Sequence, residues 1–68
     1  MDAVLDNRRR LEELFRERVL ARMTPLGHEP AYMSDLEEEI VATEAAYVAS
    51  VVTEIASLRA DLGERRVG

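Results

Sequence analysis

Glu44 has the most unusual surroundings of any acidic residue, because it lies within a line of apolar residues at helical spacing. A carboxylate buried without a partner is costly, so it must be paired with a cation, protonated or close to water. Together with Glu37 and a second chain, it would form a carboxylate cluster of the kind that holds metal ions in helical bundles. Such bundles also use a Glu-x-x-His motif, whereas Tyr47 stands three places after Glu44. We therefore expect no metal or cofactor, and keep a ligand- or metal-binding bundle centred on Glu44 as an alternative.

Arginine side chains can supply the partners of these carboxylates. Arg18 and Arg22 flank or enter the apolar face of the first predicted helix. In an antiparallel helix pair with this short turn, facing residue numbers would sum to about 57, which brings both arginines near Glu37. We predict buried ion pairs among four residues and keep an anion-binding site as the lesser alternative. The four candidates are Glu44, Glu37, Arg18 and Arg22.

The usual groups of catalysis are missing from the sequence. It has no Cys, which excludes disulfides, thiolate zinc sites and cysteine nucleophiles. The one histidine, His28, falls in a predicted loop, and Ser34 is predicted to cap a helix without a His–Asp pair to activate it. We expect a protein that is not an enzyme and that has no catalytic, cofactor-binding or metal-ligating residues.

The charge pattern argues against nucleic acid and against a membrane span. The net charge is −5, and the one basic run, Arg8–Arg10, has acidic residues on both sides. Residues 40–58 contain no Lys or Arg, but Glu44 and Glu54 make insertion into a bilayer costly. Residues 1–6 lack the basic start and apolar run of a signal peptide, so we expect a cytoplasmic protein.

Two helical segments must position these residues. Residues 2–23 contain no Gly or Pro and are rich in helix-forming residues. Breaker residues follow in Thr24–Pro30, and a second helix starts at Pro30 or, more strongly, at the capping box 34–37. Gly63 is predicted to end it after Leu62. We predict one all-α domain over 1–68: an antiparallel hairpin of helices 2–23 and 31/34–62, a loop at 24–33 and a frayed tail at 64–68.

Apolar residues line one face of the first helix and two faces of the second. The first helix presents Val4, Leu11, Phe15 and Val19, with Leu5, Leu14 and Met23 at the edges. One face of the second helix holds Leu36, Ile40, Tyr47, Val51, Ile55, Leu58 and Leu62. The opposite face holds Val41, Ala45, Ala49, Val52 and Ala56. The first helix can cover only one of these faces. At about 1.5 Å per residue, its cover along the second helix ends near residue 54.

The uncovered apolar surface suggests a function in association. A chain of 68 residues without disulfides usually needs a further source of stability, and oligomerisation is the one left. We predict a small helical oligomerisation module that self-associates through its second helix, as a four-helix dimer or a tetramer. The alternative is a regulatory or adaptor subunit that docks one helix face on a larger protein or nucleoprotein complex. No residue pattern in the chain identifies a known family.

Overall fold

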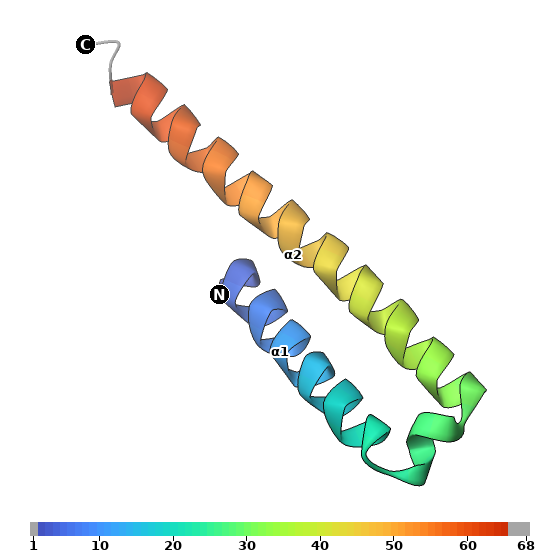
Figure 1. Cartoon of the computed structure of the whole chain (residues 1–68). Helices are drawn as coiled ribbons and strands as arrows, with labels where there is room; N and C mark the ends of the chain where they lie inside the picture. Colours follow the sequence, from blue (N-terminus) through green and yellow to red (C-terminus); the bar gives the residue numbers. More distant parts are fainter. Residues whose placement is uncertain (1, 66–68) are drawn as a thin grey trace.

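Two antiparallel helices of unequal length make up the fold (Figure 1). This computed structural model describes the backbone of residues 2–65 and the side chains of residues 2–63. Helix α1 (Ala3–Arg22) leads through a short 3-10 helix, η1 (Pro25–His28), into helix α2 (Pro30–Arg65). Within the described residues there is no strand, and the predicted all-α class is confirmed.

The difference in length between the helices gives the molecule its shape. At about 1.5 Å per residue, α1 spans roughly 30 Å and α2 roughly 54 Å. Figure 1 shows α2 continuing well past the start of α1. The radius of gyration is 17.5 Å, against about 11 Å for a compact domain of this length. The chain is therefore a rod rather than a globule.

Local hydrogen bonds explain where α1 begins and how the turn is built. The Asp2 carboxylate accepts hydrogen bonds from the backbone N–H groups of Val4 and Leu5, at 3.0 and 3.4 Å, and so caps α1. At the turn, the Thr24 hydroxyl donates to the Ala21 carbonyl at 3.0 Å and accepts from the Leu26 N–H at 3.3 Å. One threonine thus provides a hydrogen-bond partner for a backbone carbonyl at the end of α1 and for a backbone N–H at the start of η1.

Gly27 is needed for space rather than for a left-handed backbone. No glycine among the described residues has positive φ. A Cβ at position 27 would lie 2.9 Å from the Ala21 carbonyl oxygen and 3.0 Å from the Arg22 Cα. Both are backbone atoms that cannot move aside cheaply, so only glycine lets η1 fold closely against the end of α1.

Of the two starts predicted for the second helix the structure has the one at Pro30, and the predicted end was wrong by a few residues. Helix α2 begins at Pro30 and not at Ser34, and the Met33 N–H already donates to the Glu29 carbonyl at 3.0 Å. Proline suits the first turn because its missing N–H has no intrahelical partner there. Gly63 does not end the helix, which continues to Arg65, since a single glycine costs only about 1 kcal/mol. Residues 66–68 of the predicted tail lie outside the described residues.

A seven-residue pattern on each helix forms the contact between them, which we call the α1–α2 seam. Its positions alternate in steps of three and four. On α1 they are Val4, Asn7, Leu11, Leu14, Arg18 and Ala21, and on α2 they are Met33, Leu36, Ile40, Thr43, Tyr47 and Ser50. Asn7 contacts Ala46 and Arg18 contacts Glu37. The numbers of residues that face each other across the seam therefore sum to about 54, and not to the 57 expected from sequence.

The centre of the seam differs from the apolar face expected for α1. Leu14, placed at the edge from sequence, is the most buried residue at 1% exposure, and it packs with Leu36 and Ile40. Val19, expected on the face, is 56% exposed. The reason is geometric: a straight helix drifts about 20° per heptad, whereas a seven-residue seam follows the partner helix.

Candidate interaction surface

The predicted ion pairs of Glu37 form at the edge of the seam, not in its interior. Arg18 Nη1 lies 3.2 Å from both carboxylate oxygens of Glu37, and Arg22 Nη2 lies 4.0 Å from one of them. The Arg18 side chain is 27% exposed and that of Glu37 is 45% exposed, so the prediction of burial was wrong. The Arg18 guanidinium also lies over the Phe15 ring, 5.2 Å from its centroid. These contacts join α1 and α2 at the edge of the seam.

Glu44 lies outside the seam, in contrast to the buried position expected for it. It is exposed and forms no ion pair with any residue that the structure describes. The cause is the course of the seam, which passes through Thr43 and Tyr47 and leaves the side chain between them pointing to solvent. Over residues 2–63, no group of three or more His, Asp or Glu side chains is placed to hold a metal ion.

Two further contacts between the helices were missed from sequence. Arg10 pairs with Glu39, and the Tyr32 hydroxyl donates a hydrogen bond to Glu17 Oε2 at 2.6 Å. All four residues stand one place before a seam position, at Leu11, Ile40, Met33 and Arg18. A seven-residue repeat applied to both helices would therefore have placed these four residues at the contact between them.

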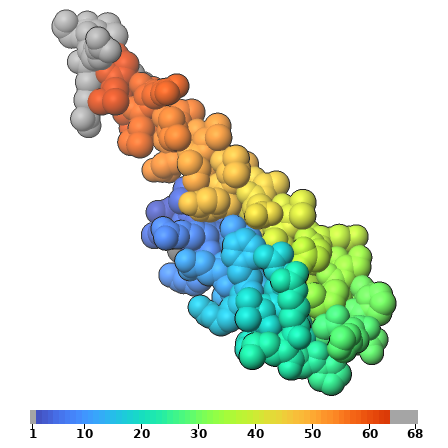
Figure 2. All heavy atoms as spheres, viewed as in Figure 1, coloured from blue at the N-terminus to red at the C-terminus, as the bar shows by residue number. Residues whose placement is uncertain are grey.

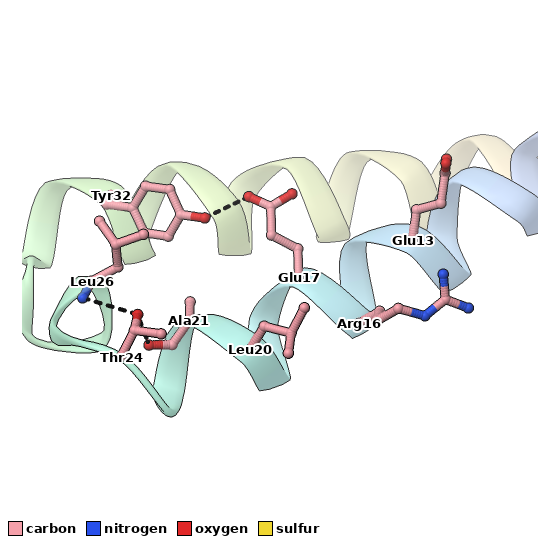
Figure 3. Close-up of a pocket in the computed structure, with 8 residues that line it drawn as sticks. All are labelled: Glu13, Arg16, Glu17, Leu20, Ala21, Thr24, Leu26 and Tyr32. Carbon is pink, nitrogen blue, oxygen red and sulfur yellow. Dashed lines mark hydrogen bonds between the residues drawn. The ribbon is translucent and has the colours of Figure 1, made fainter.

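A shallow notch of about 280 Å³ lies beside the turn (Figure 3). Tyr32 closes one side of it and Leu20 and Leu26 contribute apolar surface. The hydrogen bond to Glu17 raises the pKa of Tyr32 above its usual value of 10, and desolvation and the charge of Glu17 act in the same direction. A protonated tyrosine bound to a carboxylate is a structural link between α1 and α2, and it offers no group activated for catalysis.

The largest exposed apolar surface lies on α2, on a side that α1 does not reach. Its large side chains are 45–63% exposed, and alanines lie between them. We call one line on this surface the open stripe; its residues are Val41, Ala45, Val48, Val52, Ile55 and Leu62. Leu58, Ala49 and Ala56 are exposed beside it.

The structure divides the predicted interface residues between two environments. Leu36 and Ile40 are buried against α1, and Tyr47 and Val51 are half-buried near its start. The remaining candidates are exposed: Ile55, Leu58, Leu62, Val41, Ala45, Ala49, Val52 and Ala56. In the view of Figure 2, the orange and red part of α2 stands beyond the blue start of α1. We call Ile55–Gly63 the overhang.

The polarity of α2 changes on the α1 side where α1 ends. Residues Asp2–Val4 lie beside Ala49–Glu54, which marks the limit of the cover. Continued by the same steps, the α1-facing line runs from Tyr47 and Ser50 to Glu54, Ser57 and Asp61. The open stripe keeps its apolar residues Ile55 and Leu62 over the same distance, with Arg59 between them. The overhang therefore exposes Ile55 and Leu62 on the open stripe, and Leu58 in line with Ile40, eighteen residues or about five helical turns earlier.

Helix α2 is also long and apolar enough to cross a membrane by length and composition. The core helix of a water-soluble protein passes the same test, so this observation by itself is weak evidence.

No family model, curated protein or solved structure matches the chain. The guide to its function is therefore its own residues, above all the uncovered apolar face of α2.

Proposed function

We propose that this protein is a small, non-enzymatic helical module that self-associates through α2, with two helical hairpins forming a four-helix dimer. The observation that carries the proposal is the open stripe, which runs from Val41 to Leu62 without cover from its own chain. Exposed contiguous apolar surface of this kind marks protein interaction sites in soluble proteins.

The exposed area of the chain is large enough for such an interface. The accessible surface is 5516 Å², against about 4,300 Å² for a compact monomer of this mass. The excess of about 1,200 Å² exceeds the roughly 800 Å² that each partner buries in a standard protein interface. A second chain on α2 would bring the surface per chain into the range of ordinary folded proteins.

The small core supports the same proposal. Four described apolar residues are buried: Leu14, Ala21, Leu36 and Ile40. A chain with so few buried side chains and no disulfide gains little from its own core. Association would supply the apolar burial that the single chain lacks.

A second candidate function is an adaptor that also docks on a larger protein. The observation in its favour is a separate exposed apolar group around the turn, away from the open stripe. Its residues are Val19, Leu20, Met23 and Leu26. A ligand- or metal-binding bundle centred on Glu44 has less support, since Glu44 is exposed in the single chain.

Sedimentation of the wild-type chain and two glutamate variants tests self-association. Val52→Glu places a charge on the open stripe, and Val19→Glu places one on α1 at nearly the same exposure. We expect a wild-type oligomer at micromolar concentration, a monomer for V52E and wild-type mass for V19E. A wild-type chain that sediments as a cooperatively folded monomer would contradict the proposal, and so would a V52E chain with unchanged mass.

A further inference from the structure

We infer that the occupant of the open stripe is α2 of a second copy, lying antiparallel, with the twofold axis near Val52. This inference rests on the proposed function and adds the orientation and register of the partner. Three features of the described residues carry it: the spacing of the stripe, the size of facing side chains and the position of two exposed charges.

The spacing of the open stripe fits a long helix as partner. Positions 41, 45, 48, 52, 55, 59 and 62 alternate in steps of four and three, as in the contact line of a coiled coil. The line is about 32 Å long, the same length as α1. It begins at Val41, in the half of α2 whose other side packs against α1, and it ends at Leu62 in the overhang. The helix with a matching free line in this chain is α2 itself.

Antiparallel pairing matches the two ends of the stripe. When facing residue numbers sum to about 103, Val41 meets Leu62 of the second copy, and Val48 meets Ile55 of the second copy. Ala45 then lies opposite Arg59 of the second copy, so that a small side chain faces the stem of a long one across the contact. Near the centre, Val52 meets the corresponding residue of the other chain. The overhang of each chain is thereby covered by the first half of the other chain's α2, the half that packs against α1.

Two exposed charges select the antiparallel direction. Glu44 and Arg59 flank or interrupt the stripe, and neither pairs with another residue that the structure describes. Their numbers also sum to 103, so antiparallel pairing puts them at the same level across the contact, twice per dimer. In a parallel, in-register pair each would meet its own copy, which brings like charges together. Opposed helix dipoles favour the same direction.

Crosslinking of engineered cysteines distinguishes the two directions, since the chain has no cysteine of its own. With a short bifunctional maleimide, we expect V52C to link to itself. We expect V41C and L62C to form a linked dimer when mixed, and neither to link to itself. Self-links by V41C and by L62C, without the mixed product, would show a parallel dimer and overturn the inference while leaving the proposed function intact.

Charge reversal tests the register independently. In E44R or R59E, two opposite-charge contacts per dimer become like-charge contacts, and we expect dimerisation to weaken roughly tenfold in each. The double variant E44R/R59E restores opposite charges and should regain wild-type affinity. Single variants without effect, or a double variant weaker than both, would refute the register. A wild-type monomer would instead remove the proposed function itself, and circular dichroism of each variant checks that the helices persist.

Discussion

The two halves of α2 differ on one side and agree on another. Under α1, the α1-facing line is formed mainly by apolar residues such as Leu36, Ile40 and Tyr47. From the start of α1 onward, the same line continues with Glu54, Ser57 and Asp61. The open stripe, by contrast, carries apolar residues in both halves, with Arg59 as the interruption in the second. The comparison indicates that α2 has one side whose apolar residues stop near the start of α1 and a second side whose apolar residues continue past it.

The largest effect should come from truncating the buried half. Leu14→Ala removes the most buried side chain of the α1–α2 seam, and we expect a loss of about 3–5 kcal/mol, enough to unfold a small domain. Leu62→Ala, in the overhang, should leave the pairing of α1 with α2 unchanged because Leu62 is 57% exposed. Urea unfolding followed by circular dichroism, at a concentration where both variants are monomeric, makes the comparison. Equal losses would show that the two halves of α2 are not distinct.

Replacing glycine by alanine should change the stability of the chain in opposite directions at Gly27 and at Gly63. Gly27→Ala places a Cβ against backbone atoms of Ala21 and Arg22, and we expect a loss of about 1–3 kcal/mol from overpacking. Gly63→Ala meets no atom within 4 Å and lies inside the helix, so we expect a gain of about 0.5–1 kcal/mol. Thermal melting of both variants measures the difference. A stabilising G27A would mean that η1 does not fold tightly against α1.

The ion pairs at the edge of the seam should contribute less. Arg18→Ala removes the contacts to Glu37 and Phe15, and we expect a loss of about 0.5–1 kcal/mol that shrinks at high salt. Arg8 pairs with Glu12 within α1, and its side chain is 63% exposed, so R8A is the matched control and should change stability less. A loss several times larger for R18A would point to a deeper role for Arg18 than that of an edge ion pair.

The smallest effect should come from Tyr32 at the turn. Its pKa is raised in the folded chain by the hydrogen bond to Glu17, so folding favours the protonated form. The stabilisation is complete below pH 10 and is lost as the pH rises through the raised pKa. Tyr32→Phe should therefore melt slightly below wild type at neutral pH and lose this alkaline dependence. Melting temperatures across the alkaline range test it, and equal pH dependence in both chains would contradict it.

The sequence predicted the elements better than it predicted how they meet. The helices predicted at 2–23 and 31/34–62 match α1 and α2 to within a few residues, because helix propensity and Gly/Pro positions are local properties. Pro30 and Ser34 both looked like helix starts, and local capping could not choose between them. The candidate ionic residues show the same limit: Glu37 lies near Arg18 and Arg22, while Glu44, one heptad further on, is exposed. Both carboxylates follow a seam position by one residue, so they differ in the α1 residue that lies opposite them, and this depends on the register of the two helices, which no local pattern fixes.

By itself, the sequence determined an all-helical chain, the place of its turn and an excess of apolar surface on the second helix. The tertiary structure decided how that surface is divided: Leu36 and Ile40 are buried with Leu14, while the open stripe stays exposed. The physical reason is that a helix pair buries one line of side chains at a time, and the seven-residue match between α1 and α2 selects that line. What α1 leaves uncovered is the surface on which we place a second copy of α2.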